Sequence, residues 1–161
     1  MANPQRISIC LWFSDNGEEA ANLYVSLFPN SRIVHVNRYG PGQPLAEGTA
    51  MLVRFELDGV SFAALNGGPM FKLSEAVSLV TTCDTQAELD RLWNALIADG
   101  GAESMCGWCK DRFGLSWQII PSQISGWMGS PDKEAQGRMW GKLMGMRKID
   151  IATLDAAFRG N

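Results

Sequence analysis

The order of the predicted secondary-structure elements repeats along this chain, and the repeat limits the possible folds more than any single motif does. In the first half, alternating apolar residues predict a strand over residues 7–13. Apolar residues at helical spacing then predict a helix from Asp15 or Asn16 to Phe28. Strands follow over residues 31–39, 49–57 and 60–65, the last two joined by the hairpin signal Asp58-Gly59. This half therefore has the order strand, helix and three strands.

The second half repeats this order with different residues. A strand over residues 76–83 precedes a helix that Asp84 or Thr85 caps and that Gly100-Gly101 ends. Short strands are predicted at about residues 102–104, 106–110 and 115–121. We therefore expect an α+β protein with two βαβββ modules, at about residues 6–70 and 75–121, in a single domain over residues 1–161.

The remaining residues, about 122–159, are predicted to be helical. Ser130-Pro131-Asp132 begins a helix that runs to about Met146, and Asp150 caps a last helix over residues 151–158. Gly137, Gly141 and Gly145 lie on one side of the longer helix at four-residue spacing. They permit close approach of another backbone, either in this chain or in a second copy, and we favour packing within the chain.

Charge and composition exclude several classes of function. The net charge is −3 and no basic block is present, so nucleic acid is not an expected partner. The sequence has no apolar stretch of about 18 residues and begins without a signal-like segment. We therefore expect no membrane span and a cytoplasmic protein, in which Cys10, Cys83, Cys106 and Cys109 are reduced thiols.

One polar side chain is unusual in its local context. Asp111-x-Phe113-Gly114 predicts a tight turn, with Gly114 at a position that can take positive φ. The strand that follows is apolar and aromatic apart from Gln118. A buried amide needs hydrogen-bond partners. Gln118 therefore either ties two strands together or faces a cavity in which a ligand or a metal could bind.

These features together resemble the vicinal oxygen chelate superfamily, which includes glyoxalases, bleomycin-resistance proteins and extradiol dioxygenases. The closer resemblance is to its PhnB-like branch, also labelled the 3-demethylubiquinone-9 3-methyltransferase domain. The stretches that carry this resemblance cover nearly the whole chain and are residues 11–13, 18–20, 27–31, 64–70, 106–108, 110–111, 113–119 and 148–151. The resemblance implies that the two modules form a cupped mixed sheet, and it implies a homodimer.

The resemblance also implies where a divalent metal would bind in this chain. Metal-using members of the superfamily carry ligands on the first and fourth strands of each module, at positions that hold Ser8, Asn66, Ala76 and Gln118 here. Alanine cannot ligate a metal, and none of the four side chains carries the carboxylate or imidazole that such ions prefer. We therefore expect no metal and no cofactor. A metal-dependent lyase, isomerase or dioxygenase-like enzyme is the alternative.

Three other signals favour structural interpretations. His35, the single histidine, has no histidine or acidic neighbour in sequence, so we interpret it as a surface or dimer-contact residue rather than a catalytic one. Cys106-Gly-Trp-Cys109 lies before a turn rather than at a helix start, which favours structural thiols over a redox pair or a zinc site with Cys83 or His35. Gly67-Gly68-Pro69 lacks the following helix of a nucleotide-binding turn, which argues against methyl transfer.

The favoured hypothesis is a metal-free protein that binds a small molecule in the cup. A concave, mainly apolar site with a few amide and hydroxyl groups is typical of small-molecule pockets. The candidate pocket residues are Ser8, Cys10, Trp12, Tyr39, Asn66, Trp108 and Gln118. Two alternatives remain, namely that these side chains fill the cup or that the protein is a structural dimer without a ligand. The sequence does not name the ligand.

Overall fold

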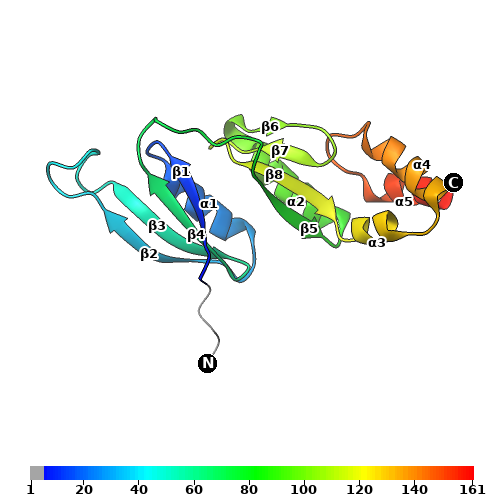
Figure 1. Ribbon diagram of the computed structural model, residues 1–161, viewed down its shortest axis with the longest axis horizontal. Helices are drawn as coiled ribbons and strands as arrows, with labels where there is room; N and C mark the ends of the chain where they lie inside the picture. Colours follow the sequence, from blue (N-terminus) through cyan, green and yellow to red (C-terminus); the bar gives the residue numbers. More distant parts are fainter. Residues whose placement is uncertain (1–5) are drawn as a thin grey trace, which may run out of the picture. The chain divides into compact units, whose positions relative to one another are not determined.

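The computed structural model describes residues 6–161, which divide into two compact units. The first unit ends at Leu73, and the second runs from Ser74 to Asn161. Each unit contains its own four-stranded sheet of mixed parallel and antiparallel strands (Figure 1). The predicted α+β class with two βαβββ modules is therefore confirmed. None of the helices in the described part of the chain combines the length and apolar character that a bilayer span requires.

The first unit follows the predicted order of elements. They are β1 (Ile9–Phe13), α1 (Gly17–Leu27), β2 (Arg32–Arg38), β3 (Ala50–Leu57) and β4 (Val60–Asn66). The sheet order is β1-β4-β3-β2, in which β1 is parallel to β4 and the other pairs are antiparallel. Helix α1 covers one face of this sheet (Figure 1). Among residues 6–73 of this unit, no helix covers the other face.

The core of the first unit lies between α1 and the sheet. Leu11 of β1 is buried on this side, and the rings of Phe55 and Phe62 stack with centroids 5.3 Å apart. Ile7 was expected on the same face, but it is 81% exposed. The pairing of β1 with β4 begins only at Ile9, so Ile7 precedes the strand and lies outside the paired part of the sheet.

The second unit repeats the order and then adds three helices. Its elements are β5 (Ser78–Cys83), α2 (Gln86–Ile97), the 3₁₀ turn η1 (Ala98–Gly100), β6 (Ala102–Glu103), β7 (Trp108–Lys110), β8 (Ser116–Pro121), α3 (Ile124–Gly129), α4 (Lys133–Leu143) and α5 (Ile151–Arg159). The sheet order is β5-β8-β7-β6, in which β5 is parallel to β8. Helix α2 packs on one face of this sheet (Figure 1).

Side-chain caps fix where α2, α4 and α5 begin. Thr85 accepts a hydrogen bond from the Glu88 backbone N–H, and the Glu88 carboxylate accepts one from the Asp84 N–H. Asp132 and Asp150 cap α4 and α5, as predicted, and each side chain accepts a hydrogen bond from a backbone N–H in the first turn of its helix. The short helix α3 lies within the stretch 122–159 that was predicted to be helical, but its bounds were not predicted, because its sequence Ile-Ser-Gly-Trp-Met-Gly has no apolar stripe at helical spacing.

The glycine stripe on α4 corrects one expectation. Gly137 and Gly141 are exposed, and a Cβ atom built on either of them would meet no atom within 4 Å. The side of α4 that packs within the chain instead carries the buried residues Ala135, Met139 and Leu143. The two glycines therefore do not serve packing within the second unit.

Candidate functional site

Three predicted pocket residues lie on or beside the face of the first sheet that is not covered by α1. Cys10 and Trp12 alternate with the buried residues Leu11 and Phe13 along β1. Ser8 is exposed and lies just before the strand begins. Cys10 and Trp12 therefore lie on the opposite face of β1 from Leu11 and Phe13, as the alternation predicted. The thiol of Cys10 is exposed to solvent.

The single histidine lies at the edge of this face. In the cross-strand register Cys10 pairs with Ala63, Ala63 with Arg54, and Arg54 with His35. His35 is exposed on the outer strand, and its neighbour across the strands is a guanidinium rather than a carboxylate. An acid–base role for His35 would need an acidic partner, so this geometry supports its interpretation as a surface residue.

Trp12 packs on the glycine segment that follows β4. Its indole Nε1–H donates a hydrogen bond to the Gly68 carbonyl at 2.9 Å, and its ring meets Phe71 edge to face at 4.9 Å. A Cβ atom at Gly67 would lie 2.3 Å from the indole ring. Glycine is therefore required at position 67, because any side chain there would displace Trp12.

Asn66 and Tyr39 hold the first unit together instead of facing a pocket. The Asn66 Oδ1 atom accepts from the Gly17 N–H at 2.8 Å, and its Nδ2 group donates to the carbonyls of Asp15 and Ala50. Tyr39 is buried and donates its hydroxyl hydrogen to the Asn66 carbonyl. Asn66 lies on the α1 side because it pairs with Phe13, so the expected position beside Ser8 and Cys10 is corrected.

In the second unit, Trp108 and Gln118 lie side by side on the face opposite α2. They pair across β7 and β8, and Gln118 pairs with Val80 on its other side. The Gln118 amide donates to the Ser78 hydroxyl at 2.9 Å. Gln118 therefore ties β5 to β8, which was one of the two roles expected for it.

A cavity of about 220 Å³ lies next to Trp108. It is lined by Glu75, Ala102, Glu103, Ser104, Trp108, Cys109, Lys110 and Ser116. The Ser116 hydroxyl is buried and has no hydrogen-bond partner. Lys110 forms an ion pair with Glu75, and this hydrogen bond lowers the pKa of the Glu75 carboxyl. The cavity thus combines an indole, an ammonium group and an unpaired hydroxyl.

Sequence reasoning missed Glu75, Lys110 and Ser116. Ser116 precedes Gln118 by two residues in a strand, so period-two alternation alone places both on one face. The ion pair between Glu75 and Lys110 joins residues 35 positions apart, and only the fold brings them together.

Asp111 holds the turn that positions this cavity. It is 3% exposed, and its Oδ1 atom accepts hydrogen bonds from the backbone N–H groups of Phe113 and Leu115. Its Oδ2 atom accepts one from the Trp117 indole at 2.9 Å. The predicted turn is confirmed, with φ +91° at Gly114. The carboxylate therefore joins the end of β7, which carries Lys110, to the start of β8, which carries Ser116.

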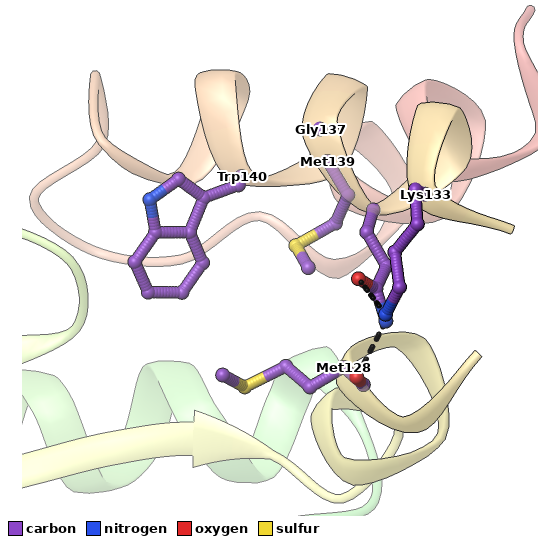
Figure 2. Close-up of a pocket in the computed structure, with 6 residues that line it drawn as sticks. Met128, Lys133, Gly137, Met139 and Trp140 are labelled. Carbon is purple, nitrogen blue, oxygen red and sulfur yellow. Dashed lines mark hydrogen bonds between the residues drawn. The ribbon is translucent and has the colours of Figure 1, made fainter. Parts of the chain in front are cut away.

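A second cavity, of about 290 Å³, lies between α3 and α4 (Figure 2). Met128, Met139 and Trp140 supply its apolar lining. The amide of Gln136 is paired with Lys133 and with the carbonyls of Met128 and Ser130. Because its polar lining groups are used internally, this cavity is an apolar groove rather than a site with free polar groups.

None of the four positions expected for a metal carries the carboxylate or imidazole that a divalent cation prefers. Asn66 lies on the helix-covered face with its amide bonded to backbone groups, and Ala76 precedes β5 and offers no donor. The Gln118 amide pairs with Ser78, and both are neutral. Across residues 6–161, no three His, Cys, Asp or Glu side chains group closely enough to hold a metal ion.

The four cysteines are free thiols. Burial is the largest cause that raises the pKa of Cys83 to about 11 and that of Cys109 to about 12, so both stay protonated near neutral pH. Cys106 lies before β7 with its sulfur 3.6 Å from that of Met144. Cys106 and Cys109 are therefore not joined, and the Cys-x-x-Cys spacing does not form a disulfide.

Comparison with known proteins finds a match that spans both βαβββ modules. The family model for 3-demethylubiquinone-9 3-methyltransferase matches residues 5–120. A Bacillus cereus protein named for PhnB and for this methyltransferase is 36% identical, with a TM-score of 0.67, over 72% of this chain and 99% of its own. A Pseudomonas aeruginosa protein is 23% identical over 73% of this chain and 98% of its own, with a TM-score of 0.59.

FosX, a fosfomycin resistance protein of Listeria monocytogenes solved with Mn(II) and sulfate, is 14% identical over 73% of this chain and 91% of its own, with a TM-score of 0.51. This likeness concerns the fold. No curated protein matches the sequence. The two βαβββ modules are a fold that this chain shares with these neighbours. The chain belongs to the PhnB-like family labelled 3-demethylubiquinone-9 3-methyltransferase.

Proposed function

We propose that this protein binds a small organic molecule, without a metal ion, at the face of the second sheet that carries Trp108 and Gln118. One observation carries the proposal. The Ser116 hydroxyl is buried without a partner and lines a cavity that also contains an indole and an ammonium group. A buried polar group without a partner is destabilising, and a ligand that hydrogen-bonds to it removes this cost.

The donor set supports binding without a metal. Ser78 and Gln118 are neutral and already hydrogen-bond to each other, whereas a divalent cation prefers carboxylate or imidazole ligands. The Mn(II) in the FosX structure belongs to a protein that shares only the fold with this chain. Methyl transfer is less well supported, because Gly67-Gly68-Pro69 leads into a turn and irregular backbone rather than a helix.

Ligand-observed NMR with a library of small aromatic acids, amides and alcohols tests this proposal. Protein dialysed against EDTA is predicted to bind some of these compounds, and Trp108→Ala is predicted to weaken their binding at least tenfold because the indole provides most of the apolar contact. Trp140→Ala, at the α3–α4 groove, is the matched control and leaves these hits unchanged. A stoichiometric metal in the purified protein that is lost in Gln118→Ala would contradict the metal-free proposal.

We also propose a homodimer, in the cytoplasm, in which the exposed side of α4 contacts its copy. The side chains of Met128, Trp140 and Met144 are about half exposed there, near the exposed Gly137 and Gly141. Glu134 lies near the start of α4 and Lys142 near its end. An antiparallel copy would therefore place opposite charges near each other while the glycines let the two helices approach closely. The free thiols suit a reducing compartment.

Light scattering after size exclusion tests the dimer. The unmodified protein is predicted to elute as a dimer at about 100 µM, and Trp140→Glu is predicted to elute as a monomer, because a carboxylate would lose hydration at the centre of the contact. Ser125→Glu adds the same charge to α3 and serves as the control that stays dimeric. A dimer that persists unchanged in Trp140→Glu would show that the contact lies elsewhere.

A further inference from the structure

The ion pair at the cavity joins two residues with very different surroundings. Lys110 is in β7, where its strand is hydrogen-bonded to β6 and β8. Glu75 lies before β5 in a segment without regular structure, and its side chain is 66% exposed. The carboxylate is thus carried by an irregular, exposed segment, whereas the ammonium group is carried by a residue of the sheet, and its side chain is less exposed, at 38%. Of the two residues, Glu75 is the one that can move out of the ion pair.

Ser116 lies directly beside this pair. In the strand register Ser116 is opposite Lys110 on one side and opposite Ser78 on the other. The Ser78 hydroxyl is already engaged by the Gln118 amide. The Ser116 hydroxyl therefore remains without a partner although it is 1% exposed, and it lines the same cavity as Lys110 and Glu75. An unpaired, buried hydroxyl next to an ammonium group can donate to an anion that Lys110 also holds.

We infer that the cavity takes a small molecule through a carboxylate group, and that Glu75 occupies the place of this carboxylate on Lys110 until the ligand displaces it. This inference rests on the proposed binding function and names its ligand class. A ligand carboxylate has two oxygens, one for Lys110 and one for Ser116. Trp108 and Ala102 offer apolar surface for the rest of the molecule.

The balance of interactions favours such an exchange. An exposed ion pair contributes little net stability, so the loss of the contact between Glu75 and Lys110 costs little. The entering carboxylate restores the charge pair and adds the hydrogen bond to Ser116 that Glu75 leaves unmade. Glu75 therefore acts as an internal competitor, which lowers the apparent affinity without closing the site.

Benzoate, benzyl alcohol and inorganic phosphate, titrated in EDTA, are the probes that test this inference. Binding is followed by the NMR signal of the Trp108 indole, which is assigned with Trp108→Phe. Benzoate is predicted to bind about fivefold more tightly to Glu75→Gln than to the unmodified protein, because an exposed ion pair is worth at most about that factor. It is predicted to bind at least tenfold more weakly to Lys110→Met and about fivefold more weakly to Ser116→Ala. Benzyl alcohol, which lacks the charge, is predicted to bind weakly and equally to the unmodified protein and Glu75→Gln.

The outcomes separate this inference from the binding function on which it rests. If benzyl alcohol moves the Trp108 signal and benzoate does not, the carboxylate assignment is overturned while the binding function stands. If phosphate binds more tightly than benzoate to Glu75→Gln, the ligand group is a phosphate and not a carboxylate. If library compounds bind elsewhere and no compound moves the Trp108 signal, the site itself is overturned. Because the Glu75 side chain is exposed, Glu75→Gln is expected to keep the fold, and a thermal unfolding curve of this variant checks it.

Discussion

Replacing Asp111 by Ala is expected to lower the free energy of unfolding by about 4 kcal/mol, because three N–H groups, two of them buried and one partly buried, lose their acceptor at once. These are the backbone groups of Phe113 and Leu115 and the indole of Trp117. Each of these hydrogen bonds is about 3 Å long and accepted by a carboxylate that is 3% exposed. Urea denaturation followed by circular dichroism measures the change.

Two further variants test whether the loss of stability comes from the hydrogen bonds of the Asp111 carboxylate. Asp111→Asn keeps one acceptor oxygen but places an NH₂ group against N–H donors, so an intermediate loss of about 2 kcal/mol is expected. Asp155→Ala removes a partly exposed carboxylate that pairs with the exposed Arg159, and it should change stability by less than about 0.5 kcal/mol. Equal losses for Asp111→Ala and Asp155→Ala would contradict the role assigned to the turn.

The second large effect is expected at Asn66. Asn66→Ala should lower the free energy of unfolding by about 3 kcal/mol, because the Gly17 N–H and the carbonyls of Asp15 and Ala50 lose their partner inside the first unit. The loss should appear in the same urea titration. It should be seen as earlier unfolding of the first unit, which contains all of these groups.

The neighbouring glycine provides a second test of the same contact. A Cβ atom at Gly17 would lie 2.7 Å from the Asn66 Oδ1 atom, so Gly17→Ala should also destabilise the protein even though alanine favours helices. Asn22→Ala, at an exposed position of the same helix, is the control that leaves stability unchanged within about 0.5 kcal/mol. A stabilised Gly17→Ala would mean that Asn66 does not hold the start of α1 as described.

The elements of the fold could be predicted because their signals are local. Period-two alternation, the Asp58-Gly59 hairpin and the caps at Thr85, Asp132 and Asp150 depend on residues close in sequence, and the structure confirms each of them. The Asp111 turn was also predicted, since Gly114 supplies the positive φ that it requires. The hydrogen bonds of the Asp111 carboxylate were not part of that prediction.

The candidate site was harder to predict because it depends on the register between distant strands. The faces of Asn66 and Trp12 follow from the pairing of β1 with β4, and a shift of one residue would exchange them. Gln118 was recognised because an amide is unusual in such a strand, and its partner Ser78 is 40 residues away in sequence. Ser116 looked ordinary in sequence, because only the fold shows that its hydroxyl is buried without a partner.

The central claim is that a small molecule binds beside Trp108 and Ser116 without a metal ion. The most direct test follows the Trp108 indole signal while the tightest-binding compound of the fragment screen is titrated, once in EDTA and once with added Mn(II). The claim predicts a saturable shift with the same dissociation constant in both titrations, weakened in Ser116→Ala. A shift that occurs only with Mn(II), or a compound that binds without moving the Trp108 signal, would contradict it.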